Sequence, residues 1–181
     1  GPNQINALHR QAADWFAQEG LIEEALHHAL AAQDLARAAK LMEQGLCAVL
    51  NRQDLATLRR WSNLLPADFR RQRPGLLIIE AWVLYYSVQL GRLAGVLQQI
   101  ETLIVSGMEV ETEPARELLA QVLTLRAAIA HFGNQPTVSI AHVQQALTLL
   151  PPSWAYVRAL CRFWLGVSGQ LSGQGETIGR D

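Results

Sequence analysis

The apolar residues of this 181-residue chain recur at intervals of three and four, and no segment alternates with period two. Spacing of that kind gathers apolar side chains on one face of an α-helix, whereas a half-buried strand alternates from residue to residue. Good helix formers, above all Leu, Ala and Gln, dominate the composition. The sequence therefore predicts an all-α fold with no strand.

Nine helices are predicted from these stripes and from the residues that interrupt them. Asp34 and Asp54 are good N-cap residues, proline suits a first helical turn, and Gly20, Gly91 and Gly133 are expected just past helix ends. Short connections between such helices predict antiparallel hairpins, and repeated hairpins predict an α-solenoid. The predicted helices cover residues 6–18, 21–32, 34–49, 54–65, 74–90, 93–105, 114–132, 136–150 and 153–171, with a short turn at 67–72 and a polar loop at 106–113.

The charge balance argues against two classes of protein. The chain carries 15 Lys+Arg against 16 Asp+Glu, a net charge of -1, and half of it is hydrophobic. Disordered chains combine low hydrophobicity with high net charge, and nucleic-acid-binding domains usually carry a basic excess. The densest basic stretch holds Arg70, Arg71 and Arg73, which are interpreted as solvated arginines at a helix end.

The two cysteines, Cys47 and Cys161, each lie in an apolar helical run, which is typical of free buried thiols in a reducing, cytoplasmic compartment. No signal peptide is recognised. The most apolar run, residues 76–88, contains Glu80 and is shorter than the ~20 residues that span a bilayer, so no membrane association is expected. Residues 1–2 resemble the remnant of a cleaved tag, and residues 174–181 form a polar tail.

Two stretches partly match the ~34-residue tetratricopeptide pattern of paired helices. The first covers residues 79–106, and the second covers residues 118–151 and ends in proline. A third, residues 153–171, lacks its second helix. Residues 3–72 are therefore assigned to a helical arm and residues 73–173 to tetratricopeptide-like repeats. The incomplete repeat is expected to expose an apolar interface for a longer chain or a second copy, formed by Trp154, Trp164 and Leu165.

Residues 8–32, from Leu8-His9-Arg10 to Leu30-Ala31-Ala32, resemble the helical segment that follows the ATPase module of large LuxR-type ATP-dependent transcriptional regulators. These regulators are similar to the activator of the maltose regulon and belong to the STAND ATPases. Residues 34–39, 58–66, 73–74 and 81–82 fit the same pattern, so the resemblance extends over nearly the whole chain.

The resemblance implies a non-catalytic sensor or protein-interaction segment that binds a small-molecule inducer or a regulatory protein and controls self-association. No Gly-x-x-x-x-Gly-Lys-Ser/Thr motif and no basic helix-turn-helix occur in the sequence. ATP binding and DNA binding would therefore belong to other modules of such a regulator, and this segment is expected to bind no cofactor and no nucleic acid. The alternative function is a tetratricopeptide-like adaptor that binds proteins and has no connection with transcription.

Trp82, Tyr85 and Tyr86 form the best candidate binding site in the sequence. They share a helix, and Gln89 and Arg92 lie just beyond it, which would suit a small polar ligand or a peptide. Core packing is the alternative, because aromatic residues dominate helical cores. No carboxylate, histidine or cysteine group shows the arrangement of a catalytic or metal site, so neither is predicted.

Overall fold

The computed structural model describes residues 2–107 and 112–173, and within these residues it contains ten helices and no strand. The all-α prediction is confirmed. The helices are α1 (Pro2–Gln18), α2 (Ile22–Ala31), α3 (Leu35–Asn51), α4 (Leu55–Leu64), α5 (Ala67–Arg71), α6 (Pro74–Tyr86), α7 (Leu90–Gly107), α8 (Glu113–Phe132), α9 (Pro136–Leu149) and α10 (Ala155–Leu171).

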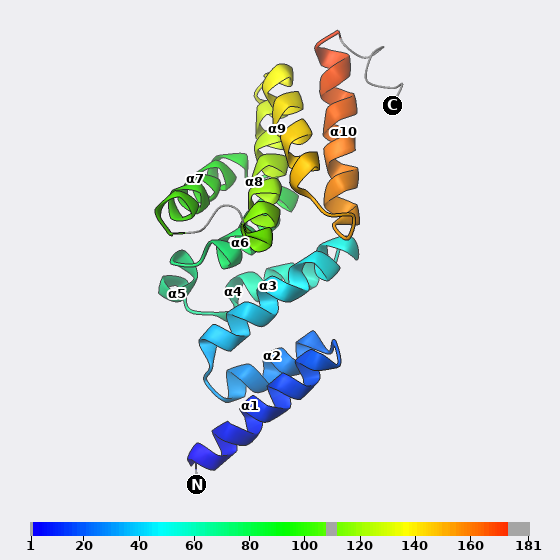
Figure 1. The fold of residues 1–181 in the computed structure, drawn as a ribbon. Coiled ribbons are helices and arrows are strands. Elements are labelled where there is room, and N and C mark those ends of the chain that lie inside the picture. The colour runs from blue at the N-terminus through cyan, green and yellow to red at the C-terminus, as the bar shows by residue number, and fades with distance from the viewer. Residues whose placement is uncertain (1, 108–111, 174–181) are drawn as a thin grey trace.

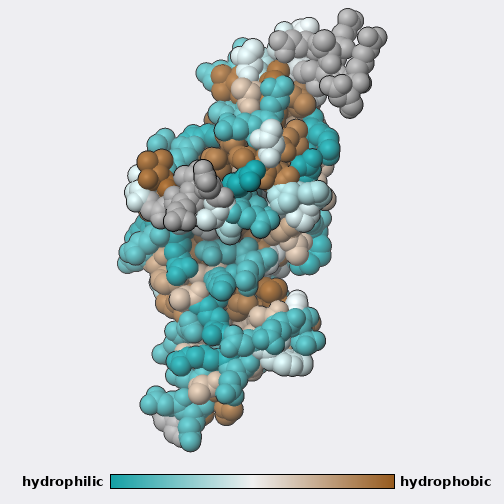
Figure 2. Space-filling model, in the orientation of Figure 1, coloured by the Kyte–Doolittle hydropathy of each residue, from teal (hydrophilic) through white to brown (hydrophobic). Residues whose placement is uncertain are grey.

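The helices form an elongated molecule in which α1 and the C-terminal end of α10 lie at opposite ends (Figure 1). Consecutive helices pack in pairs, most extensively α8 with α9 and α1 with α2. Helix α6 lies in the middle and contacts α3, α4, α5, α7 and α8. One connected set of buried residues runs from Ala13 to Trp164. On the face seen in Figure 2, hydrophobic residues lie in scattered patches, and the α1 end is mainly hydrophilic.

In most helices the apolar stripes place the buried side chains as the sequence predicts. The first helix is an exception, because Leu8 and Trp15, which the spacing places on its apolar face, are 64% and 54% exposed. The N-caps are also confirmed, because the Asp34 and Asp54 carboxylates each accept a backbone N–H, at 3.0 Å from Arg37 and 3.0 Å from Thr57. Helix α6 is apolar almost all round, and seven of its residues are buried. Such a helix needs cover on several sides, and its five neighbouring helices provide it.

Four predicted boundaries are wrong. The turn at 67–72 contains the short helix α5, and the first helix begins at Pro2 rather than at residue 6. The helix predicted to end at residue 90 ends at Tyr86, and the next begins at Leu90 rather than Leu93. Gly91 therefore lies inside α7. Within the loop predicted at 106–113, residues 108–111 lie outside the described residues, as does the tail at 174–181.

Five turns between helices share one backbone geometry. In each, a single residue has a positive φ of 54–75°, and the next helix begins two residues later. The residue after it donates its N–H to a carbonyl five positions back, for example Gln89 to Leu84 at 2.9 Å. This is the Schellman ending of a helix, which usually has glycine at the left-handed position. Only one of the five has it; the left-handed residues are Gly20, Gln33, Gln53, Val88 and Asn134.

A contact between distant parts of the chain joins the end of α3 to the start of α10. Asn51 Nδ2 donates to the Ser153 carbonyl at 2.7 Å, and Asn51 Oδ1 accepts the Tyr156 N–H at 3.0 Å. Trp154, the N-cap residue of α10, provides no side-chain cap. Asn51 therefore supplies from another helix the acceptor that a helix start needs.

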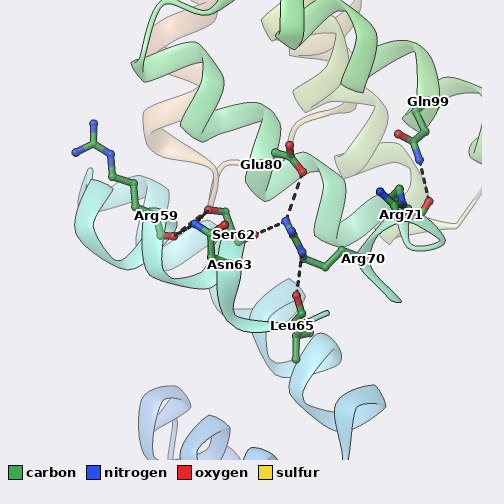
Figure 3. Close-up of polar contacts among 8 residues, drawn as sticks. All are labelled: Arg59, Ser62, Asn63, Leu65, Arg70, Arg71, Glu80 and Gln99. Atoms are coloured by element: carbon green, nitrogen blue, oxygen red, sulfur yellow. Dashed lines mark hydrogen bonds and ion pairs between the residues drawn. The ribbon is translucent and has the colours of Figure 1, made fainter. Parts of the chain in front are cut away.

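The basic stretch holds one arginine with a structural role. Arg70 donates from Nε to the Leu65 carbonyl at 3.0 Å, from Nη1 to the Ser62 carbonyl, and lies 3.5 Å from Glu80 (Figure 3). It therefore binds carbonyls at the end of α4 and links them to α6. The interpretation of Arg70 as a solvated arginine is wrong, because folding of α5 turns its side chain inward.

We expect Arg70→Met to lower the free energy of unfolding by about 2 kcal/mol, because it leaves carbonyls and a carboxylate without a charged donor. The neighbouring Arg71 is the matched control. Its exposed side chain pairs only with Asp68, so Arg71→Met should cost less than about 0.5 kcal/mol. Urea unfolding followed by circular dichroism measures both, and equal effects would contradict the structural role of Arg70.

Among the described residues, no helix is both long enough and apolar enough to cross a membrane.

Candidate functional site

A cavity with an apolar rim lies where the end of α6, the start of α7, the end of α8 and α10 meet. It has a volume of about 280 Å³. Six of the eight residues that line it are aromatic. They are Tyr85, Tyr86, Val88, Leu90, Phe132, Tyr156, Phe163 and Trp164. We call this the aromatic cavity.

The rings of the aromatic cavity touch one another across three helices. Tyr86 stacks on Tyr156 with ring centroids 6.4 Å apart and an interplanar angle of 26°. Trp164 meets the edges of Phe132 at 5.6 Å and Phe163 at 5.1 Å. Offset-stacked and edge-to-face pairs are the favoured arrangements of such rings. Ring contacts between α6, α8 and α10 therefore hold the walls of the cavity in place.

Burial makes the phenols of Tyr85 and Tyr86 harder to deprotonate. Burial, with a contribution from nearby Tyr156, raises the pKa of Tyr85 to about 12. Burial also raises the pKa of Tyr86, and the hydroxyl of Tyr156 adds to that rise. Both side chains therefore remain neutral hydrogen-bond donors at physiological pH.

Two polar atoms of these walls are buried and have no hydrogen-bond partner among the described residues, the hydroxyl of Tyr86 and Nε1 of Trp164. The hydroxyl of Tyr86 lies beside that of Tyr156, and Nε1 of Trp164 lies beside the hydroxyl of Tyr85. Each contact affects the pKa of the tyrosine, Tyr86 or Tyr85, but neither meets hydrogen-bond geometry. Most buried polar groups in folded proteins are paired. Two such donors on one cavity therefore need an explanation.

The rim of the cavity is apolar and exposed. Val88 is 69% exposed, Phe132 58% and Phe163 55%. Val88 also has a φ of 55°, a left-handed conformation that a β-branched residue rarely adopts. Exposed apolar side chains and strained backbone both concentrate at binding sites.

Because of this strain, we expect Val88→Asn to raise the free energy of unfolding by about 1 kcal/mol, since Asn tolerates the left-handed conformation. Val105→Asn is the control, because Val105 is exposed in right-handed helix α7. That variant should be neutral or slightly destabilised. Thermal unfolding measures both, and a destabilised Val88→Asn would mean that Val88 contributes packing that outweighs its strain.

The raised pKa of Tyr85 and Tyr86 also predicts a pH dependence. An unfolded tyrosine titrates near pH 10, so the folded chain binds these protons more tightly than the unfolded chain does. Below about pH 10 both states keep these protons, and stability does not depend on them. As the pH rises from 10 toward about 12, the value for Tyr85, the unfolded chain releases its protons first and is favoured. The free energy of unfolding should therefore fall over this range, and fall less in the Tyr85→Phe, Tyr86→Phe double variant. Equal slopes in urea unfolding would contradict the burial of these phenols.

The structure places only some of the candidate residues named from the sequence at the cavity. Tyr85 and Tyr86 line the cavity, but Trp82 does not. Trp82 is completely buried, and its Nε1 donates to Gln121 Oε1 at 2.9 Å, which favours core packing over a binding role. Gln89 and Arg92 pair with each other at 2.8 Å on the surface, outside the cavity lining.

The side chains expected to form an exposed apolar face on α10 are mostly buried. Trp154 and Trp164 are each only 4% exposed and Leu165 is partly buried, so the prediction that they form an exposed face is wrong. Helices α8 and α9 and the end of α3 cover that side of α10. Trp164 instead contributes to the aromatic cavity from within. Phe163, one residue earlier, provides the exposed apolar surface.

Sequence reasoning missed Val88, Leu90, Phe132, Tyr156 and Phe163 as site residues. They lie on three separate segments, at the start of α7, at the end of α8 and on α10, which only the tertiary fold brings together. The exposed position of Phe163 had one usable signal, because it follows the polar Arg162 and falls off the apolar stripe of its helix.

A second hollow, lined in part by charged residues, lies along α3. Two adjoining cavities of about 840 and 300 Å³ share Glu43 and Arg73 as lining residues. Arg73 lies over the ring of Phe69, and burial raises the pKa of Glu43 while Arg73 opposes that rise. The larger cavity is bordered by α1 and α3 and the smaller by α3, α6 and α8. We call this hollow the α3 groove.

Neither cysteine has the environment of a nucleophile. Both are free, and burial is the main cause that raises the pKa of Cys47 and of Cys161. Reactive cysteines need the opposite shift, because the thiolate is the nucleophile.

No protein-family model matches the sequence, and no solved structure matches the fold. The observations that define the chain are thus its all-helical architecture and its aromatic cavity.

Proposed function

We propose that this chain is a non-catalytic recognition segment that binds an inducer or a partner at the aromatic cavity. The observation that carries the proposal is an exposed apolar rim around a cavity whose walls contain two unpaired buried donors. The lining residues offer no acid or base near neutrality, since the only titratable side chains among them are tyrosines. Such walls suit binding rather than chemistry.

We further propose that the hairpins form a tetratricopeptide-like solenoid and that the parent protein is a bacterial ATP-dependent regulator of the LuxR type. The resemblance of residues 8–32 to those regulators supports the parent, and the repeated turn geometry supports the solenoid. In this setting the segment senses a ligand in the cytoplasm and controls self-association. ATP and DNA would be bound by other modules.

The second candidate function is a protein-binding adaptor unrelated to transcription. The α3 groove favours it, because a long hollow with charges of both signs could hold an extended peptide. The gene that encodes the chain distinguishes the two functions. A nucleotide-binding module before the segment and a helix-turn-helix after it would support the regulator. Absence of both would contradict the proposal that the parent protein is such a regulator.

Binding at the aromatic cavity is tested with a mixed library of metabolites and short peptides, screened by nuclear magnetic resonance. Phe163→Glu replaces a ring that lines the cavity with a charge and should weaken binding of a genuine ligand by at least about tenfold, because the apolar contact is lost and a charge lies beside it. Val105→Glu is the matched control, because Val105 is equally apolar, exposed and outside the cavity lining. If no compound shifts the signals of cavity residues, the proposed function fails.

A further inference from the structure

The unpaired donors of Tyr86 and Trp164 indicate what the aromatic cavity takes up. An unsatisfied buried donor costs about 1–3 kcal/mol, and here two such donors belong to residues that line the same cavity. Two other buried nitrogens also lack a hydrogen-bond partner, Trp61 Nε1 and Arg37 Nε. Trp61 lines neither the aromatic cavity nor the α3 groove, and Arg37 Nε lies 3.5 Å from the Asp34 carboxylate. A bound molecule with an acceptor atom would satisfy the cavity donors and remove that cost.

The electrostatics of the walls select for a neutral ligand. None of the eight lining residues has a charged side chain at neutral pH, because Tyr85 and Tyr86 keep their protons. A carboxylate would lose its hydration here without gaining a partner of opposite charge. An ammonium group could contact the faces of the rings, but it has no acceptor for the O–H of Tyr86 or the N–H of Trp164. The two donors therefore favour a neutral ligand with an acceptor.

The chemistry of the walls also selects for a flat, aromatic body. Six rings offer faces and edges, whereas the polar atoms are limited to three phenol hydroxyls and one indole N–H. A sugar of this size would have many hydroxyls and few partners. At about 280 Å³ the cavity is at the lower end of small-molecule sites, near 300 Å³.

An apolar side chain from a partner protein is the competing occupant. A phenylalanine or leucine would fill the apolar space, but it would leave the hydroxyl of Tyr86 and Nε1 of Trp164 without an acceptor. The two donors therefore favour a small molecule over a side-chain anchor.

Resting on the proposed function, we infer that the aromatic cavity binds a neutral aromatic small molecule that carries a hydrogen-bond acceptor. Its ring system packs among Tyr86, Tyr156 and Phe163. Its acceptor receives the O–H of Tyr86, the N–H of Trp164, or both.

Three matched probes test this inference by calorimetry: 2-acetylnaphthalene, which is neutral with a carbonyl acceptor; 2-ethylnaphthalene, which lacks the acceptor; and 2-naphthoate, which is charged. The ketone should bind about tenfold more tightly than the hydrocarbon, the effect of one satisfied buried donor, and more tightly than the anion. The indole N–H resonance of Trp164 should move on addition of the ketone. Equal affinity of ketone and hydrocarbon, or tightest binding of the anion, would overturn the inference.

Tyr86→Phe is the critical variant, because it removes only the hydroxyl oxygen. It should keep the hydrocarbon affinity, reduce the ketone preference, and leave the thermal midpoint unchanged or raised, since an unpaired polar atom has been removed. A full ketone preference in this variant, with no shift of the Trp164 N–H, would also overturn the inference.

The library screen distinguishes failure of the proposed ligand class from failure of the proposed function. If none of the naphthalenes binds but a library peptide or charged metabolite binds in a Phe163-dependent manner, the ligand class is wrong and the proposed function stands. If nothing binds at the cavity in either experiment, both are wrong.

Discussion

Trp82→Ala should lower the free energy of unfolding by about 4 kcal/mol and the thermal midpoint by roughly 10 °C. Trp82 is completely buried in the middle of α6, against the edge of Tyr85 at 5.8 Å. Its removal leaves a large void and deprives Gln121 Oε1 of its donor. Domains of this size are stable by only about 5–15 kcal/mol, so the loss is a large part of the total.

Trp15→Ala is the control for this substitution. Trp15 is exposed on α1 and contacts Phe16 with ring centroids 4.9 Å apart. Its truncation should cost less than about 1 kcal/mol, as surface changes usually do. Chemical unfolding of both variants measures the difference. A Trp82→Ala protein as stable as Trp15→Ala would show that Trp82 is a site residue rather than part of the core.

The second large effect is expected at Gly45, where α3 approaches α4 and α2 closely. A Cβ atom at Gly45 would lie 2.8 Å from Trp61 Cη2 and 3.1 Å from Ile22 Cγ2. Trp61 is fully buried and cannot move aside. Gly45→Leu should therefore cost about 3 kcal/mol, the upper part of the usual range for overpacking, despite the better helix propensity of leucine.

Gly166→Leu tests the same change without the contact. Gly166 lies on the exposed side of α10, and a Cβ there meets nothing within 4 Å. That substitution should stabilise the protein by about 0.5–1 kcal/mol, because glycine is a poor helix residue. The two variants should thus change thermal stability in opposite directions. A stabilised Gly45→Leu would mean that α3 and α4 can separate without loss.

Local signals in the sequence were enough to predict most helices. Asp34 and Asp54 accept the first free N–H groups of their helices, and Pro74 and Pro136 occupy first turns, as expected. These features depend on a few neighbouring residues, so the sequence displays them directly. The same holds for α6, whose continuous apolar run required cover on all sides.

Two kinds of feature could not be predicted. The turn at Val88 uses a residue that rarely adopts a positive φ, and Gly91 nearby offered a better but false signal. Tertiary packing overrides the local preference there. The cavity also depends on Phe132 and Phe163, whose proximity to Tyr86 is set by how α8 and α10 pack. Single-helix spacing placed Trp82 and Tyr85 together but could not tell which faced the core.

The tie between Asn51 and the start of α10 has a consequence for how the molecule responds as a whole. In a chain of stacked hairpins, each unit normally contacts only its neighbours, and one end can loosen while the other stays folded. Here two hydrogen bonds join Asn51 to residues 102 and 105 positions later, so the helices between them form a closed ring of chain. Closing a loop of chain in this way restricts the segments inside it. The aromatic cavity lies within this ring or on α10 close to its closure, so a ligand held there acts on a linked body rather than on one hairpin.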